Sequence, residues 1–116
     1  MAVTIYHNPR CAKSRATLAL LRARGIEPHV IEYLQDTPST TQLAKLVRQL
    51  GLTPRGLLRT KEPDYKQAGL DNPKLSDTAL LAAMVKHPKL IERPIVVKGN
   101  RAVLGRPPEN VLTLLK

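Results

Sequence analysis

The sequence contains no tryptophan and no phenylalanine, and tyrosine occurs only three times in 116 residues. A hydrophobic core must therefore be built mainly from aliphatic side chains, and few rings are available to stack on nucleic-acid bases. No stretch approaches the roughly 18 unbroken apolar residues of a membrane-spanning helix, and the N-terminus lacks the charged and apolar regions of a signal peptide. We therefore expect a cytoplasmic protein that binds neither membranes nor nucleic acids.

Acidic residues are scarce, since 9 Asp and Glu face 19 Lys and Arg and give a formal net charge of +10. The basic residues are scattered along the chain and form no runs of about five or six, which nucleic-acid-binding tails contain. A basic enzyme that attracts a small oxyanion explains the same charge. The length and the 42% hydrophobic content predict one domain over residues 1–116, and we expect a monomer.

Cysteine occurs once, at Cys11, so the chain can form no internal disulfide. A lone cysteine is often a buried, inert small hydrophobe. Cys11, however, lies at a predicted strand-to-helix junction with Arg10, Lys13 and Arg15 close by in sequence, where positive potential favours the thiolate. We interpret it as a nucleophile whose reducing partner comes from outside the chain. The cysteine and the three histidines lack zinc-ligand spacing, so we expect no metal site. The sequence has no Gly-rich phosphate loop, and we expect no tightly bound cofactor.

The N-terminal third predicts a βαβ unit. Ala2–Tyr6 and His29–Tyr33 are rich in β-branched residues, and a helix over Ala12–Arg24, ended by Gly25, lies between them. Two strands joined by a helix pair in parallel through a right-handed crossover. The apolar positions of this helix are Ala16, Leu18, Ala19, Leu21 and Ala23.

Residues 35 to about 90 predict an all-helical insertion. A capping box at Ser39–Gln42 opens a helix that ends at Gly51, and Ser76 caps another that stops at His87-Pro88. Between these helices the pattern weakens, with a helical turn at Leu57-Leu58 and an interruption around Pro63.

The strand pattern returns in Pro94–Val97 and Ala102–Leu104, which predict an antiparallel hairpin, and Pro107-Pro108 opens a last helix. The order β-α-β, helical insertion, β-β-α is that of an α/β, thioredoxin-like fold with a mixed four-stranded sheet. That layout places a proline, here Pro94, opposite the cysteine, often after a cis peptide bond.

Cys11-Ala12-Lys13-Ser14 forms a C-x-x-S motif, in which Ser14 can donate a hydrogen bond to a thiolate but cannot form a disulfide. Ser14 could equally be a first-turn residue that satisfies a backbone N–H group. His7 could favour the thiolate as an imidazolium, or it could be a strand-end histidine bonded to the backbone.

Arg59, Arg93 and Arg106 come from three separate segments. An exposed arginine is usually a solvated charge, but guanidinium groups brought together near Cys11 would bind a tetrahedral oxyanion through paired hydrogen bonds.

These motifs resemble the glutaredoxin-coupled arsenate reductase family over essentially the whole chain. The segments that carry the resemblance are Tyr6–Cys11 with Ser14-Arg15, Leu57–Arg59, Ile91–Val97 and Gly105–Pro107. The thiol loop is similar to a chromosomal branch with Asn-Pro-Arg-Cys-x-Lys-Ser-Arg, whereas well-established members resemble Asn-Pro-Ala-Cys-Gly-Thr-Ser.

The resemblance implies reduction of arsenate, or a similar oxyanion, to arsenite, with glutathione as co-substrate and glutaredoxin as partner. It implies that Cys11 is the nucleophile, that His7 and Ser14 tune its thiolate, and that Arg59, Arg93 and Arg106 bind the oxyanion.

Two other functions fit the same sequence. One is a glutathione-dependent thiol oxidoreductase that acts on another small substrate. The other is a binding protein akin to the Spx regulators, which share the fold and contact RNA polymerase. Those regulators commonly use C-x-x-C as a redox switch, and Ser14 removes that switch here.

Overall fold

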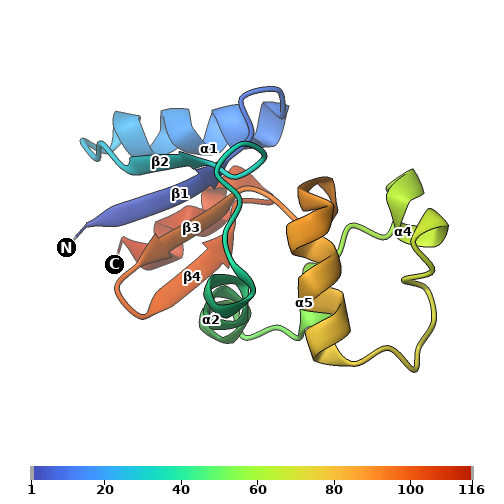
Figure 1. The fold of residues 1–116 in the computed structure, drawn as a ribbon. Helices are drawn as coiled ribbons and strands as arrows, with labels where there is room; N and C mark the ends of the chain where they lie inside the picture. Colours follow the sequence, from blue (N-terminus) through green and yellow to red (C-terminus); the bar gives the residue numbers. More distant parts are fainter. Residues whose placement is uncertain (1, 116) are drawn as a thin grey trace. The chain divides into compact units, whose positions relative to one another are not determined.

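The computed structural model describes residues 2–115, and its backbone forms two compact units (Figure 1). The first unit holds the chain up to Asp36 and from Arg93 onward, and the second is Thr37–Glu92. The first unit contains the whole sheet, and the second consists mainly of helices.

The sheet has four strands, β1 (Val3–His7), β2 (His29–Glu32), β3 (Ile95–Lys98) and β4 (Arg101–Leu104), in the order β2-β1-β3-β4. The pair β1–β2 is parallel, and the pairs β1–β3 and β3–β4 are antiparallel. The mixed four-stranded thioredoxin-like sheet is therefore confirmed.

The register of the sheet brings distant parts of the sequence to one edge. Tyr6 in β1 lies opposite Ile95 in β3, which lies opposite Leu104 in β4. Because β1 ends where β3 begins and β4 ends, the loop after β1, the residues before β3 and the residues after β4 meet at this edge.

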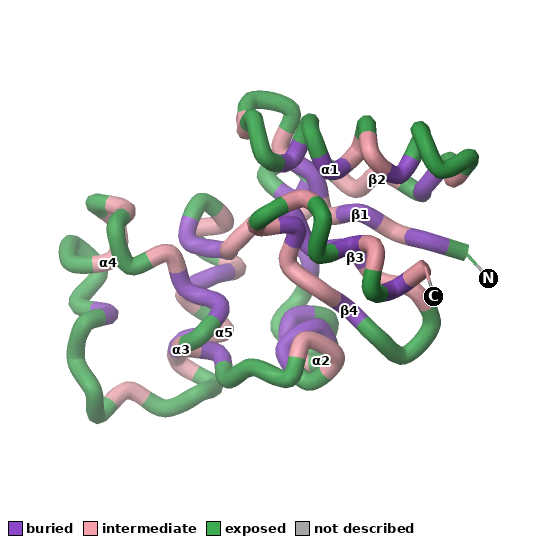
Figure 2. The backbone as a smooth tube through the Cα atoms, turned by 180° about the vertical axis from the view of Figure 1, so that it is seen from behind, coloured by how far each residue is buried: buried purple, intermediate pink, exposed green. Residues whose placement is uncertain are grey.

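Helix α1 (Ala12–Ala23) packs on β1 and on the 3₁₀ helix η2 (Pro108–Leu114), which also contacts β3 and β4. Figure 2 shows buried residues concentrated along β1 and β3. The buried core of this unit consists of Val3, Ile5, Leu21, Val96, Val111 and Leu114.

The buried face of α1 is not formed by its apolar positions alone. Its buried residues are Ser14, Thr17 and Leu21, which lie three and four residues apart on one face. The two hydroxyl side chains can be buried because both form hydrogen bonds, as described below. Three of the apolar positions of this helix, all of them alanines, are exposed: Ala16, Ala19 and Ala23.

The second unit contains the helices α2 (Thr40–Leu50), α3 (Pro54–Leu57), α4 (Pro63–Gln67), α5 (Asp77–Lys86) and η1 (Pro88–Leu90). Helices α2 and α3 and the turn η1 all pack against α5. The capping box is confirmed: Ser39 Oγ accepts from Gln42 N at 3.1 Å, and Gln42 Oε1 accepts from Ser39 N at 2.9 Å.

Two helices differ from their predictions at proline residues. Pro63 begins α4 at a point where the sequence predicts an interruption, because proline is tolerated in the first turn of a helix. The predicted C-terminal helix is present but is a 3₁₀ helix, closed by bonds of the tighter type such as Asn110 N to Pro107 O at 3.0 Å.

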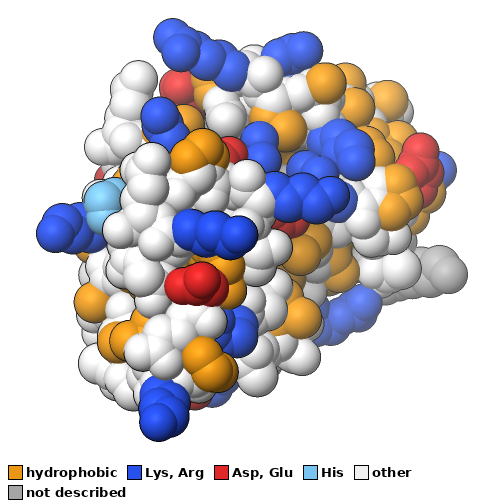
Figure 3. Space-filling view, turned by 90° about the vertical axis from the view of Figure 1, so that its right-hand side faces the viewer, with side chains coloured by type: hydrophobic (Ala, Val, Ile, Leu, Met, Phe, Trp, Pro, Cys, Tyr) orange, Lys and Arg blue, Asp and Glu red, His pale blue; other side chains and the backbone are white. Residues whose placement is uncertain are grey.

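Charged side chains are distributed widely on the face of the molecule in Figure 3, where Lys and Arg side chains lie among hydrophobic groups and fewer acidic ones. Within residues 2–115, no helix combines the length and the apolar character that crossing a bilayer requires.

Candidate active site

Cys11 occupies the N-cap position of α1, with an extended backbone at φ −95° and ψ 122°. Its N–H donates to Asn8 O at 3.0 Å, and its carbonyl accepts from Arg15 N at 3.0 Å. The half-buried thiol is free and makes no capping hydrogen bond. It therefore lies at a helix N-terminus, where the helix dipole favours negative charge.

The loop before Cys11 is held by its own polar groups. Asn8 Oδ1 accepts from Arg10 N at 3.0 Å, and Arg15 Nη1 donates to Pro9 O at 2.9 Å. These two bonds, together with the one from Cys11 N, fix the path of the chain from the end of β1 into α1.

Ser14 anchors the same loop from the first turn of α1. Its side chain is 0% exposed, and its Oγ lies 2.6 Å from His7 Nδ1 and accepts from Asn8 N at 3.0 Å. The structure thus shows the second alternative considered for Ser14, a hydroxyl that satisfies a backbone N–H, and the same hydroxyl also contacts His7.

Burial lowers the pKa of His7, and the positive charges of Arg15 and Arg22 add to this effect while the Glu32 carboxylate opposes it. His7 is therefore a neutral imidazole near pH 7, in contrast to the imidazolium considered from the sequence. Any effect on Cys11 would pass through Ser14. If His7 Nδ1 carries the proton, Ser14 Oγ accepts twice and its hydroxyl proton is free for another acceptor.

Arg93 and Arg106 lie together. Arg106 Nη1 donates to Arg93 O at 3.5 Å, and each arginine precedes a cis proline, Pro94 or Pro107. Within the described residues, Arg93 Nε and Nη1 are buried and have no hydrogen-bond partner. Buried donors are almost always paired in folded proteins, so two unpaired guanidinium nitrogens suit an anionic ligand.

The arginine segments are joined to α1 by close packing. Gly105 N donates to Pro94 O at 2.9 Å, and Gly105 O accepts from Thr17 Oγ1 at 3.3 Å. Thr17 Oγ1 also contacts Lys13 O at 2.8 Å. Gly105, which precedes Arg106, therefore lies directly against the helix that Cys11 begins and is bonded to Pro94, which follows Arg93.

Arg59 belongs to the second unit, whereas the other predicted site residues belong to the first. Its guanidinium is paired with Glu62, and its Nε lies 3.4 Å from Glu92 Oε1. Nη1 also contacts Lys89 O at 3.4 Å. Two carboxylates thus balance the positive charge of Arg59.

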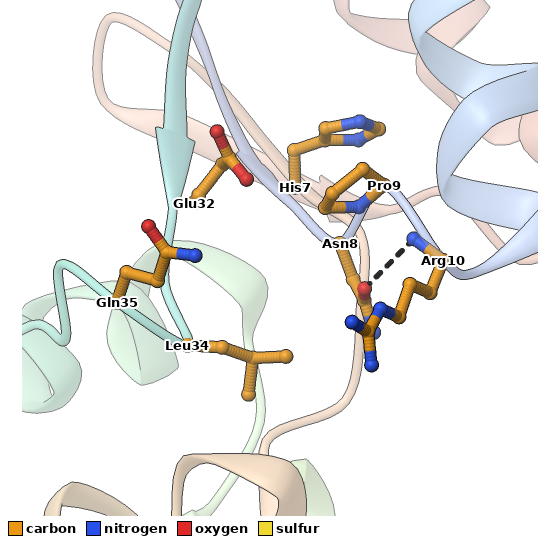
Figure 4. Close-up of a pocket in the computed structure, with 7 residues that line it drawn as sticks. All are labelled: His7, Asn8, Pro9, Arg10, Glu32, Leu34 and Gln35. Carbon is orange, nitrogen blue, oxygen red and sulfur yellow. Dashed lines mark hydrogen bonds between the residues drawn. The ribbon is translucent and has the colours of Figure 1, made fainter.

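A cavity of about 240 Å³ opens beside the thiol loop (Figure 4). Its lining residues are His7, Asn8, Pro9, Arg10, Glu32, Leu34 and Gln35. The residues from the end of β2 were missed from the sequence. The signal that could have found them is the predicted parallel pairing of the first two strands, because parallel strands end at the same edge of a sheet.

Within the described residues, no group of three or more His, Cys, Asp or Glu side chains could hold a metal ion.

Comparison with known proteins shows the family of the chain. A model of the ArsC family matches residues 6–114. An arsenate reductase of Haemophilus influenzae is 49% identical over 116 residues, which cover 99% of this chain and 100% of that protein. The uncharacterized protein YfgD of Escherichia coli K12 is 50% identical over 114 residues, 97% of this chain and 96% of that protein.

A solved structure of arsenate reductase from Vibrio cholerae has a TM-score of 0.95 and 57% identity, with 97% of each chain covered. These matches extend over nearly the whole sequence. The chain belongs to the ArsC family.

Proposed function

We propose that this protein is an arsenate reductase that uses Cys11 as its nucleophile and glutathione and glutaredoxin as its reductants. Residues 1–116 act as a single catalytic domain, working as a monomer in the cytoplasm. Support comes from the ArsC family match, the whole-length similarity to arsenate reductases and the position of Cys11 at the N-terminus of α1.

The observation that best supports an oxyanion as substrate is the pair of buried Arg93 nitrogens, Nε and Nη1, that have no hydrogen-bond partner within the described residues. Leaving a buried donor unpaired costs about 1–3 kcal/mol, and more when the group is charged. A tetrahedral oxyanion supplies the missing acceptors and balances the charge. Arg106, which contacts the backbone of Arg93, adds a second cation at the same place.

In the first chemical step, the Cys11 thiolate attacks As(V). A sulfur–arsenic bond forms, and one arsenate oxygen takes up protons and leaves as water. Hydrogen bonds from Arg93 and Arg106 stabilise the negative charge that the arsenic oxygens carry in the transition state.

In the second step, glutathione thiolate attacks the Cys11 sulfur of the adduct. The sulfur–arsenic bond breaks and its electron pair stays on arsenic, which is reduced from As(V) to As(III) and leaves as arsenite. Cys11 is left in a mixed disulfide with glutathione. A glutaredoxin thiolate then attacks the glutathione sulfur and releases Cys11 as thiolate.

The external reductants follow from the residue at position 14. Ser14 occupies the position of the second cysteine in a C-x-x-C motif, the residue that would resolve a disulfide on the first cysteine. The chain has no second thiol. Arg59 can join the oxyanion site in this scheme only by exchanging Glu62 or Glu92 for the substrate.

The test is arsenate-dependent oxidation of NADPH in an assay coupled through glutathione, glutaredoxin and glutathione reductase. We expect turnover by the natural protein and none by Cys11→Ser. Arg93→Ala and Arg106→Ala should each raise the KM for arsenate by tenfold or more, since a hydrogen bond to a charged group contributes about 1.5–3 kcal/mol. Arg24→Ala, which removes an exposed arginine at the end of α1, is the control.

Absence of arsenate-dependent turnover, or undiminished turnover in Cys11→Ser, would overturn the proposal. Turnover of glutathione mixed disulfides without any response to arsenate would support the thiol oxidoreductase instead.

A further inference from the structure

The cavity beside the thiol loop has charges of opposite sign on its two sides. Figure 4 shows Glu32 and Gln35 on one side and Asn8, Pro9 and Arg10 on the other, with Leu34 between them at the base of the view. The imidazole Nδ1 of His7 forms a hydrogen bond with Ser14 of α1, so this nitrogen is not available to a ligand in the cavity.

Both charges are available to a ligand. Within the described residues, neither the Arg10 guanidinium nor the Glu32 carboxylate forms an ion pair, and both residues are exposed. The backbone N–H of Arg10 donates to Asn8 Oδ1, a bond that does not involve the guanidinium. A zwitterionic group, with an ammonium toward Glu32 and a carboxylate toward Arg10, would satisfy both.

The size and position of the cavity further restrict the kind of ligand that it can bind. At about 240 Å³ it is smaller than the roughly 300 Å³ at which sites for whole drug-sized molecules begin, so it suits one end of a small peptide. Arg10 directly precedes Cys11, and their Cα atoms are about 3.8 Å apart. A ligand held here therefore contacts the residue that directly precedes the nucleophile.

We propose that this cavity binds the γ-glutamyl end of glutathione, with Glu32 holding its ammonium group and Arg10 its α-carboxylate. This inference rests on the proposed function, since it assigns a site to the co-substrate. The glycine end of glutathione carries a carboxylate without an ammonium group, so Glu32 repels that end. The apolar side chain of Leu34 packs against the methylene groups of the glutamyl side chain.

Binding is tested directly with S-methylglutathione, whose thioether cannot enter thiol chemistry. Titration into ¹⁵N-labelled protein should shift the amide resonances of Asn8, Arg10 and residues 32–35. Glu32→Gln should raise the Kd about three- to fivefold, the loss expected for one ion pair at an exposed site. Glu109→Gln, an identical change at an exposed position in η2, should leave the Kd unchanged.

A second probe, N-acetyl-S-methyl-cysteinylglycine, carries an acetyl group in place of the γ-glutamyl group. It therefore lacks both the ammonium and the α-carboxylate of that group and should not shift these resonances. Equal binding of the two probes would overturn the proposal, as would shifts confined to other residues. An unchanged Kd in both Glu32→Gln and Arg10→Gln would also overturn the proposal. The ¹⁵N spectrum of each variant shows independently whether that variant is folded.

Kinetics separates this inference from the proposed function. If arsenate turnover occurs, Glu32→Gln should raise the KM for glutathione and leave the KM for arsenate in place. Turnover in which the KM for glutathione does not move would refute the subsite while the proposed function stands. Absence of arsenate turnover with γ-glutamyl-dependent binding of the probe would refute the proposed function and support the subsite.

Discussion

Ser14 is fully buried, and two neighbouring groups depend on its hydroxyl. The N–H of Asn8 donates to Ser14 Oγ at 3.0 Å, and His7 Nδ1 lies 2.6 Å from the same atom. Because Cys11 N in turn donates to Asn8 O, the position of the nucleophile rests on this one side chain.

Ser14→Ala should therefore lower the free energy of unfolding by about 1–3 kcal/mol, since it leaves a partly buried backbone N–H without an acceptor. It should also slow alkylation of Cys11 by iodoacetamide several-fold at pH 7, because the loop that presents the thiol loses its anchor. Urea denaturation and the alkylation rate measure the two effects.

Ser76→Ala is the matched control, since Ser76 Oγ accepts one backbone N–H, from Ala79 at 3.1 Å, at the start of α5. It should cost about 1 kcal/mol and leave the alkylation rate unchanged. Equal alkylation rates in Ser14→Ala and the natural protein would show that Ser14 does not position Cys11.

At the scale of the element, strands and long helices follow from sequence periodicity, but the chemistry of a buried face does not. The βαβ unit and the hairpin were predictable because β-branched runs and turn residues mark them. The burial of Ser14 and Thr17 was not, because it depends on hydrogen-bond partners outside the helix. The partners of Ser14 are His7 and the N–H of Asn8, and the partner of Thr17 is the carbonyl of Gly105, 88 residues away in sequence.

Some residues of the candidate site were likewise predictable from the sequence, and others were not. Cys11, His7 and Ser14 lie within eight consecutive residues, so a local motif could identify them, although their roles remain predictions. The pairing of Arg59 with Glu62 and Glu92 had no sequence signal, because exposed and paired arginines look alike in a single sequence. The cavity at Glu32 arises from strand pairing, which brings the ends of β1 and β2 together.

Gly105 directly follows β4 and packs against α1, and both elements position residues of the candidate site. A Cβ atom at this position would lie 2.5 Å from Thr17 Oγ1 and 2.8 Å from Pro94 Cγ. Both distances are far below van der Waals contact, so the backbone at Gly105 approaches α1 and Pro94 more closely than any side chain allows.

Gly105→Ala should lower the free energy of unfolding by about 1–3 kcal/mol, the usual cost of overpacking, and should raise the KM for arsenate because it displaces the segment that carries Arg106. Thermal unfolding and the coupled assay measure these effects. Removing the obstructing side-chain atoms in the double variant Thr17→Ala/Gly105→Ala should make the cost of Gly105→Ala smaller than in the natural background.

Gly56→Ala serves as the control for the glycine change itself, since its new Cβ would meet only ordinary contacts of 3.5 Å or more. Within α3 it should be neutral or slightly stabilising. If Gly105→Ala were as harmless as Gly56→Ala, close packing at Pro94 would not hold the arginine segment in place.

At the scale of the whole molecule, the buried neutral state of His7 makes stability depend on pH. Its pKa is lowered in the folded protein, chiefly by burial, so the unfolded chain binds a proton more readily. Between the folded pKa and the unfolded value of about 6.5, the unfolded state carries more protons, and the free energy of unfolding rises with pH. This contribution is complete above about pH 6.5 and is lost as pH falls through the folded pKa.

Urea denaturation between about pH 5 and 7.5 should therefore show stability declining below pH 6.5, with a slope from this one group of at most about 1.4 kcal/mol per pH unit. His7→Asn removes the titrating ring and should flatten the decline in that range, whatever its effect on stability at pH 7.5. His29→Asn, at an exposed position in β2, should retain the decline. A slope below pH 6.5 that persists unchanged in His7→Asn would mean that the acid sensitivity of the fold arises elsewhere than at the histidine bonded to Ser14.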